Sequence, residues 1–332
     1  MPCYYPRQGW RAKKVNESGK RSIVFNPRYA FMDMPITVPC GQCIGCRLEK
    51  SRQWAIRITH EASLYDNNCF LTLTYDNEHL PKDGNLVKQH FTKFMKRLRK
   101  NYGKKNPYYR CSDPLRWKEW NDNVNNKIRY FMCGEYGEQL GRPHYHAIIF
   151  NFDFDDKELL HVKQGIPLYT SEKLSRLWTD ENTGKNRGFC TIGQVTFESA
   201  GYVARYCTKK VSGAAKEDHY KSVDAISGEI IQKEPEYAQM SKKPSIGKAW
   251  FDQYYLDIYR HDVMSVRCRD MRPPKYYDKE FEKIDPKRMA YLKKQRLDNA
   301  IDNPENEYQR LLTKCELQHL KARKLHRSYE ND

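Results

Sequence analysis

Apolar residues in the middle of the chain follow two periodicities, one typical of strands and one typical of helices. Runs rich in aromatic and β-favouring residues predict strands at residues 70–75, 128–133, 144–150 and 189–196. Apolar positions at helical spacing predict helices at residues 47–65, 87–98, 171–178 and 198–211. After the first helix, the elements therefore follow the order strand, helix, strand, strand, helix, strand, helix.

This order is that of the ferredoxin-like split βαβ arrangement. We therefore expect an α+β protein with a ferredoxin-like core, in which helices flank an antiparallel sheet and one face of the sheet stays free for a site. Residues 103–126 are polar, and we expect them to form a loop inserted into this core.

The two ends of the chain lack the regular pattern of the core. The N-terminal stretch is rich in cysteine, proline and glycine, and it shows little periodicity. The C-terminal stretch is charged, with a short apolar pattern at helical spacing, and we expect it to be largely helical. We therefore divide the chain into a Cys-rich N-terminal segment, a central domain and a basic C-terminal extension, at residues 1–46, 47–212 and 213–332.

The charge of the chain points to a polyanionic partner. With 59 Lys and Arg against 42 Asp and Glu, the formal net charge is +17. Nucleic acid is the commonest partner of such a basic protein, although a merely soluble basic protein or one bound to acidic membrane would share the composition. No run approaches 18 apolar residues, so we expect no membrane span. No secretory signal is visible, so we expect the 11 cysteines to be reduced thiols in a cytosol.

A pair of histidines at the start of the third predicted strand forms a candidate metal site. His144 and His146 alternate along the strand and therefore project to the same face. Glu135 ends the preceding strand, and a hairpin would bring its carboxylate beside the imidazoles, with Glu138 as the competing third ligand. Two nitrogens and one oxygen suit Mg²⁺ or Mn²⁺, with zinc and nickel able to compete. The alternative is that both histidines are ordinary surface residues of a strand.

Paired tyrosines on the last predicted helix of the core supply candidate nucleophiles. Tyr202 and Tyr206 are four residues apart, so both phenols lie on one face of the helix. Lys209 and Lys210 follow one turn later, where they are placed to contact phosphate. Attack by a phenol on a nucleic-acid phosphate would give an aryl ester that a free 3′-hydroxyl can reverse. Taken alone, such tyrosine spacing usually reflects packing.

In this combination the motifs resemble those of the HUH endonucleases, specifically the rolling-circle replication initiators of gokushovirus-like single-stranded DNA phages of the microvirus group. The resemblance covers residues 47–212 and rests on the strand at 70–75, the His-Tyr-His strand and the two-tyrosine helix. It implies a metal-dependent endonuclease and strand transferase that nicks single-stranded DNA at a replication origin. It also implies a 5′-phosphotyrosine link and a free 3′-hydroxyl that primes synthesis.

The resemblance also implies partners. The chain has no G-x-x-x-x-G-K-[ST] sequence, so we expect it to use the helicase and DNA polymerase of the host, in the bacterial cytoplasm. Two other readings remain: a relaxase or transposase with the same chemistry, and a non-catalytic single-stranded nucleic-acid-binding protein with a ferredoxin-like sheet. Relaxases typically offer a third histidine where this chain offers a carboxylate.

Three closely spaced cysteines form a second candidate metal site. Cys40, Cys43 and Cys46 have the spacing C-x-x-C-x-x-C, and Cys3 or a more distant cysteine would complete a structural zinc site. A bacterial iron–sulfur run would require a cysteine where the chain has Lys50. The alternative is a turn of reduced thiols without metal. No organic cofactor is predicted.

Overall fold

A computed structural model describes residues 3–17, 19–107, 114–137, 139–163, 165–206, 220–223, 228–300 and 303–323 of the 332-residue chain. The chain forms two compact units: one combines Met1–Lys50 with Glu282–His326, and the other contains Ser51–Phe281. This division differs from the boundaries expected at residues 46 and 212, which stay predictions from composition. We call these the terminal unit and the central unit.

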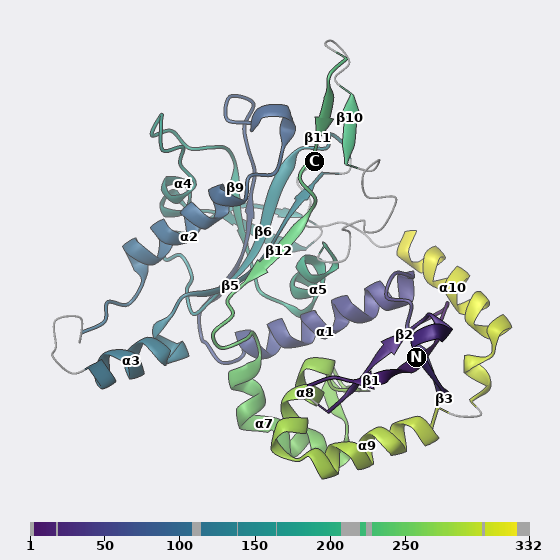
Figure 1. Ribbon diagram of the computed structural model, residues 1–332. Helices are drawn as coiled ribbons and strands as arrows, with labels where there is room; N and C mark the ends of the chain where they lie inside the picture. Colours follow the sequence, from purple (N-terminus) through teal and green to yellow (C-terminus); the bar gives the residue numbers. More distant parts are fainter. Residues whose placement is uncertain are drawn as a thin grey trace. The chain divides into compact units, whose positions relative to one another are not determined.

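The central unit is built on a seven-stranded antiparallel sheet with the order β12-β5-β6-β4-β9-β8-β7 (Figure 1). Its four middle strands are the predicted ones: β4 (Asn68–Leu73), β5 (Arg129–Tyr136), β6 (Pro143–Phe150) and β9 (Cys190–Gly193). Three further strands extend it at its two edges: β7 (Glu158–Lys163), β8 (Ile166–Thr170) and β12 (Tyr237–Met240). The expected α+β architecture with a helix-flanked antiparallel sheet is thus confirmed.

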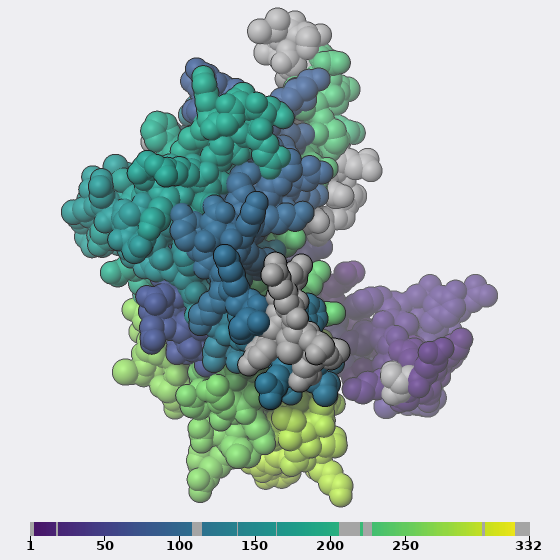
Figure 2. Space-filling view, turned by 90° about the vertical axis from the view of Figure 1, so that its left-hand side faces the viewer, coloured from purple at the N-terminus to yellow at the C-terminus, as the bar shows by residue number. Residues whose placement is uncertain are grey.

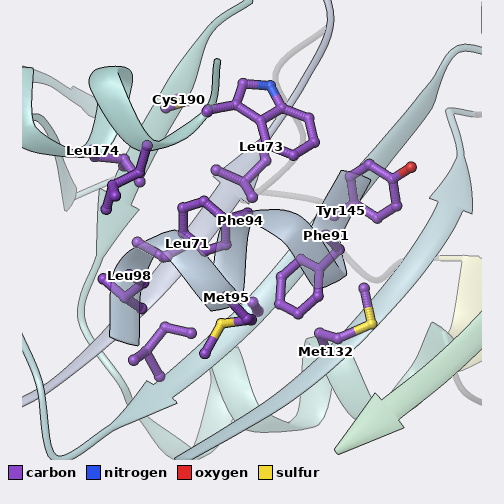
Figure 3. Packing of buried hydrophobic residues seen from close by; sticks show 14 of the residues in the cluster. Leu71, Leu73, Phe91, Phe94, Met95, Leu98, Met132, Tyr145, Leu174 and Cys190 are labelled. Atoms are coloured by element: carbon purple, nitrogen blue, oxygen red, sulfur yellow. The ribbon is translucent and has the colours of Figure 1, made fainter. Parts of the chain in front are cut away.

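Two helices pack on one face of this sheet. They are α2 (Lys88–Tyr102) and α4 (Glu172–Leu177), and Ser171 caps α4 by accepting a hydrogen bond from the Leu174 N–H. The apolar stripe of α2 is fully buried against alternate residues of the strands, as the cluster in Figure 3 shows for Phe91, Phe94, Met95, Leu98, Leu71, Leu73, Met132 and Tyr145. In Figure 2, blue residues around α2 and teal residues around α4 form one continuous surface over this face.

Helices also cover part of the opposite face, so the expectation of a free sheet face is wrong for the middle of the sheet. α1 (Ile44–Ala62) and α5 (Phe197–Tyr206) contribute Ala55, Ile58, Ala200 and Val203 to a second buried cluster. The strands contribute Phe70, Phe131, Cys133, Ile148 and Phe150. The middle strands β4, β5 and β6 therefore bury apolar residues on both faces, which is why their sequences read as continuous runs rather than alternations.

Several regular elements lie in stretches for which the sequence predicted a loop or no strand. The polar stretch at 103–126 contains a helix, α3 (Pro114–Asp122), and a 3-10 turn, η3 (Val124–Asn126), so the loop prediction is wrong there. Short or exposed strands account for the other cases: β7, β8, β10 (Lys221–Val223), β11 (Ile230–Gln232) and β12. Strands of three to six residues in which at most one described side chain is buried leave little apolar signal.

The remaining elements of the central unit follow β12 and include a small hairpin. They are α7 (Lys248–His261), β13 (Met264–Val266), β14 (Arg269–Met271) and most of α8 (Lys275–Ile284), with the 3-10 turn η2 (Lys82–Gly84) earlier in the chain. Within the described part of the chain, no helix combines the length and apolar character needed to cross a membrane.

The terminal unit contains a second, smaller sheet. Its strands are β1 (Arg7–Val15), β2 (Arg21–Val24) and β3 (Ala30–Val38), in the order β2-β1-β3, with the 3-10 turn η1 (Pro27–Tyr29) before β3. The helices of this unit are α9 (Pro286–Asp298) and α10 (Tyr308–Arg323), joined by the 3-10 turn η4 (Pro304–Asn306). The N-terminal segment is therefore a sheet and not the irregular stretch that its weak periodicity suggested.

Candidate metal and tyrosine site

The side chains of Glu135, His144 and His146 converge on one point between β5 and β6. Glu135 Oε1 lies 3.2 Å from His144 Nε2 and 3.1 Å from His146 Nε2. The three ligand atoms all lie within 4.8 Å of one another. The trio expected from the sequence is thus brought together.

The register of the hairpin explains this convergence. Glu135 stands directly opposite His144 in the antiparallel pair, and opposite residues project to the same face. The turn that sets this register is closed by a hydrogen bond from the Gly137 N–H to the Arg142 carbonyl, 2.9 Å long. His146 follows two residues after His144 and therefore shares that face.

Hydrogen bonds at the far nitrogen of each imidazole hold the rings in place. Nδ1 of His144 lies 3.2 Å from the Arg142 carbonyl oxygen, and Nδ1 of His146 lies 3.0 Å from the Thr72 hydroxyl. A carbonyl oxygen can only accept, so Nδ1 of His144 donates to it, and Nε2 of the same ring is directed at Glu135. Metal-binding histidines are commonly oriented in this way.

The site is buried but charged. The side chains of Glu135 and His146 are each 1% exposed, while that of His144 is 14% exposed. Burial raises the pKa of Glu135, but hydrogen bonds with the two imidazoles lower it by more, so the net pKa lies below its ordinary value. An ionised carboxylate therefore lies 3.2 and 3.1 Å from the two imidazole Nε2 atoms, and a bound cation would satisfy all three groups.

The donor set fits a divalent cation. Octahedral coordination at about 2.1 Å places neighbouring ligand atoms about 3 Å apart. The separations of 3.1 and 3.2 Å between the Glu135 oxygen and the two nitrogens match that spacing. One carboxylate oxygen and two imidazole nitrogens can hold Mg²⁺ or Mn²⁺, and zinc or nickel would also accept them.

Tyr202 lies beside this trio on α5. Its hydroxyl is 3.4 Å from His146 Nε2, and its ring meets the imidazole edge to face, with centroids 5.0 Å apart. The residue is 4% exposed. The helix begins with reciprocal hydrogen bonds between Thr196 and Ser199, and the Ser51 hydroxyl donates to the Gly201 carbonyl one residue before the tyrosine. These contacts fix where the phenol enters the site.

The other predicted site residues lie outside the described part of the structure. The backbone of Tyr206 ends α5, but its side chain is not among the described groups, and neither are Lys209, Lys210 and the competing ligand Glu138. Their predicted roles stay predictions.

A cleft of about 830 Å³ opens onto the histidines from the side of β9, β8 and β7, where α1 and α5 do not cover the sheet. His144 and His146 line it together with Thr72 and Thr191. Tyr202 is not among its lining residues within the described structure. Two of the three members of the trio can therefore be reached from this cleft.

The sequence reasoning missed two residues that help to form the site and the cleft. Thr72 was predicted only as part of a buried strand, but its hydroxyl contacts His146. The sequence could have indicated this contact, because Thr72 places a hydroxyl among apolar residues on the same face of the strand as Phe70. Phe189 lines the cleft while 77% exposed. Phe189 precedes β9 by one residue and points to the same face of the sheet as Thr191. The alternation along a strand gives this shared face, but it does not show that the face lines a cleft.

The cysteine cluster lies in the terminal unit. The sulfur atoms of Cys3, Cys40, Cys43 and Cys46 all lie within 4.8 Å of one another, which favours Cys3 as the fourth member. The Sγ atoms of Cys43 and Cys3 are 4.0 Å apart, close to the separation of about 3.8 Å between thiolates bound tetrahedrally to zinc.

Backbone N–H groups point at three of these sulfur atoms. The N–H of Cys40 donates to Cys3 at 3.2 Å, that of Cys43 to Cys40 at 3.3 Å, and that of Tyr4 to Cys43 at 3.5 Å. Burial raises the pKa of Cys43, but the backbone hydrogen bonds outweigh it and lower the pKa to about 7. Burial keeps the pKa values of Cys3 and Cys46 above their ordinary value, so of these three thiols Cys43 most readily takes the thiolate form in which cysteine binds metal.

Comparison with known proteins assigns the chain to a family. The model of the family "Replication-associated protein ORF2/G2P" matches residues 68–211. Replication-associated protein VP4 of Bdellovibrio phage phiMH2K is 34% identical over 263 residues, which cover 78% of this chain and 72% of that protein. Replication-associated protein ORF2 of Spiroplasma virus 4 is 34% identical over 272 residues, with 78% and 73% covered. The chain belongs to the family of phage replication-associated proteins.

This family membership confirms the expected resemblance to replication proteins of microvirus-like phages. Replication-associated protein ORF4 of Chlamydia phage 1 is also similar, at 32% identity over 194 residues, which cover 56% of this chain and 41% of that protein. No solved structure matches the chain significantly. The region matched by the family model includes all three members of the trio and Tyr202.

Proposed function

We propose that this replication-associated protein is a metal-dependent endonuclease and strand transferase with a tyrosine nucleophile. It nicks and rejoins single-stranded DNA at the replication origin of a phage genome, and so initiates and terminates rolling-circle replication in the bacterial host. The observation that supports the proposal most directly is the position of the Tyr202 hydroxyl, 3.4 Å from a histidine of the metal trio.

The arrangement of the sheet supports the same proposal. The four middle strands lie in the order β5-β6-β4-β9, and the chain passes from β4 through α2 to β5 and from β6 through α4 to β9. This order and connectivity agree with the ferredoxin-like split βαβ arrangement that the resemblance to HUH endonucleases implies, and so support the proposal. It brings the two histidines of β6 to the centre of the sheet, between β5 and β4.

A divalent cation held by His144, His146 and Glu135 would polarise the scissile phosphate and fix its geometry. Thr72 and the Arg142 carbonyl keep the imidazole Nε2 atoms directed at that position. The cleft admits a single strand whose phosphate meets the ligands from the open side of the sheet. Because Tyr202 does not line the cleft, its phenol must move toward it by a side-chain or helix shift before attack.

The covalent step exchanges one phosphate ester for another. The phenolic oxygen bonds to phosphorus, the bond from phosphorus to the 3′-oxygen breaks, and the proton lost by the phenol is balanced by one taken up by the leaving 3′-oxygen. The product is a 5′-phosphotyrosine and a free 3′-hydroxyl from which the host polymerase extends, while a host helicase opens the duplex. Attack by a later 3′-hydroxyl reverses the exchange and rejoins the strand.

Cleavage of an end-labelled origin strand with Mn²⁺ tests this function. Mass spectrometry should find a tyrosine–oligonucleotide adduct in the wild-type protein. His144→Ala and His146→Ala should lose cleavage while binding DNA almost as well, because phosphate contacts supply most of the affinity. His161→Ala, on the exposed edge strand β7, is the matched control and should cleave normally. Unchanged cleavage in both site variants would exclude the proposed metal site, and binding without any adduct would favour a non-catalytic protein.

We also propose that the cysteine cluster holds one structural zinc ion. Cys3 lies four residues before β1, Cys40 lies two residues after β3, and Cys46 lies in the first turn of α1. Because Arg7 pairs with Val38, a metal at this point would fasten the start of β1 and the end of β3, at one end of the small sheet, to the start of the helix. Elemental analysis of protein purified without chelator should find one zinc per chain, and a folded protein without metal would contradict the proposal.

A further inference from the structure

One face of the small sheet in the terminal unit combines arginines with exposed apolar side chains. Its members are Arg7, Arg11, Arg21, Ile23, Phe25 and Phe31, which we call the arginine–aromatic face. Arg11 stands opposite Ile23 on one neighbouring strand and opposite Phe31 on the other, so these side chains share a face. The other face carries the buried Ala12 and Ala30, which also stand opposite each other.

The arginines lie against the aromatic rings of this face. The guanidinium carbon of Arg7 is 5.1 Å from the centroid of Phe25, and that of Arg21 is 5.4 Å from the centroid of Phe31. The Phe25 ring lies over Gly9, where a Cβ atom would come within 3.2 Å of it. The rings are thus held in place by the backbone and by cation–π contacts, and their position does not require a ligand.

These apolar groups nevertheless remain open to solvent. Phe25 is 50% exposed, Phe31 39% and Ile23 41%. Within the described residues, none of the three guanidinium groups has a carboxylate partner. Arg11 and Arg21 donate to backbone carbonyls, but half-exposed rings beside guanidinium groups that have no carboxylate partner are typical of a binding surface.

The charge of the sheet indicates what binds there. Residues 7–38 hold seven basic side chains against two acidic ones, Glu17 and Asp33. An acidic protein segment would pair with the arginines but would leave the rings uncovered. An unpaired nucleic-acid strand satisfies both, because its phosphates pair with guanidinium groups and its bases stack on aromatic rings.

We propose that the arginine–aromatic face binds single-stranded DNA, as a contact carried by residues other than those of the cleavage site. The inference rests on the role of the protein in DNA replication but not on the metal or tyrosine chemistry. Bases stack against Phe25 and Phe31, and Arg7, Arg11 and Arg21 pair with the phosphates that follow the strand. The face thereby holds a stretch of unpaired strand while another stretch is cut or joined.

Fluorescence anisotropy with a labelled single strand, in the full-length protein and without added Mg²⁺ or Mn²⁺, tests the proposal. Phe25→Leu with Phe31→Leu keeps the apolar volume but removes the aromatic planes, and should weaken binding about tenfold or more. Tyr291→Leu is the matched control, because Tyr291 is an exposed ring of the same unit and also has an arginine against it. It should leave the affinity unchanged.

A second pair of variants tests the cations. Arg7→Gln, Arg11→Gln and Arg21→Gln together should weaken binding of the single strand at least tenfold. Lys287→Gln, Lys294→Gln and Lys321→Gln remove the same charge from exposed positions on α9 and α10, and should have a smaller effect. Cleavage of a bound strand, measured in a single turnover at saturating DNA, should stay at the wild-type rate in every variant.

Three results would overturn the proposal. Equal losses in the face variants and their controls would show that only net charge matters. Equal losses for duplex and single strand would exclude stacking on bases. A loss of binding to anionic lipid vesicles without a loss of DNA binding would assign the face to a membrane. Because cleavage is measured separately from binding, a failure of the proposed nuclease function would not be mistaken for any of these results. Thermal melting shows whether each variant is folded.

The double variant Phe25→Tyr with Phe31→Tyr retains the aromatic rings and should therefore bind the single strand with the affinity of the wild-type protein.

Discussion

The two histidines of the trio have different surroundings although they are two residues apart. Both line the cleft, but His144 is 14% exposed and is held by a backbone carbonyl, whereas His146 is almost fully buried and is held by the Thr72 side chain. Tyr145 between them points to the other face, where its hydroxyl donates to the Val87 carbonyl and accepts from the Val87 N–H at the start of α2. Tyr145 therefore fastens β6 to the start of α2 on the face of the sheet opposite the two histidines.

The dependence of His146 on Thr72 gives a specific prediction. Thr72→Val keeps the shape of the side chain but removes the hydroxyl that lies 3.0 Å from His146 Nδ1. We expect Mn²⁺ affinity to fall about 10- to 100-fold, as is usual when the group that orients a metal-bound histidine is lost. Isothermal titration with Mn²⁺ measures the change.

Thr74→Val is the control for this experiment. Thr74 lies next to the same strand and lines the same cleft, but its hydroxyl donates to the Phe189 carbonyl and not to a histidine. Its Mn²⁺ affinity should stay within about twofold of wild type, a change of less than about 0.5 kcal/mol. Equal affinities in Thr72→Val and wild type would show that the hydroxyl does not orient the imidazole of His146.

The paired tyrosines give a second prediction at this scale. Tyr202 and Tyr206 are one helical turn apart, and we expect them to alternate as nucleophiles. Single Phe substitutions should each retain some first cleavage but fail in the coupled step of cutting and rejoining, which gel analysis of a two-origin strand detects. The double variant should form no adduct. If one single variant loses all activity and the other loses none, the enzyme uses one tyrosine.

At the scale of elements, the sequence predicted what depends on local periodicity. The stripe of Phe91, Phe94, Met95 and Leu98 identifies α2, and the strand from His144 to Phe150 is β6 within one residue. The proximity of Glu135 to both histidines also followed, because a short hairpin leaves little choice of register. These features need only neighbours along the chain.

Features that depend on distant parts of the chain were missed. The cover that α1 and α5 place over the histidine face arises from contacts such as Ala55 and Ala200 with the sheet, which no local pattern records. The strands β1 to β3 expose most of their side chains, so they lack the alternation of buried and exposed residues that marks a strand. Their arginine–aromatic face was missed for the same reason.

The cysteine cluster gives a prediction for the small sheet as an element. Cys43→Ser should remove zinc from the protein and lower the thermal stability of the terminal unit, because a site with fewer than four thiolates binds zinc weakly. Cys268→Ser is the control: Cys268 is exposed and lies in the central unit, and zinc content should not change. Elemental analysis with thermal melting measures both effects. Full zinc content in Cys43→Ser would contradict the assignment.

At the scale of the whole molecule, basic charge is distributed over parts with different tasks. The +17 charge belongs to the entire chain. The trio consists of one carboxylate and two imidazoles, and the described lining of its cleft contains one arginine, Arg142, and one aspartate, Asp76. The terminal sheet, in contrast, is strongly basic and carries no catalytic group. Long-range attraction and strand holding are therefore expected from residues that take no part in cleavage.

This separation predicts how DNA binding responds to salt. Each phosphate contact in a single strand contributes about −0.7 to the slope of log affinity against log salt concentration. The wild-type protein should therefore show a steep negative slope. If Arg7, Arg11 and Arg21 each contact a phosphate, replacing all three by Gln should make the slope less steep by about 2.

His146→Ala is the control and should leave the slope unchanged, because its imidazole is buried within the metal trio. Anisotropy titrations from low to moderate salt measure all three slopes. A slope that stays the same in the arginine variant would mean that the strand follows another surface, and a flat wild-type slope would mean that the basic charge does not hold DNA at all.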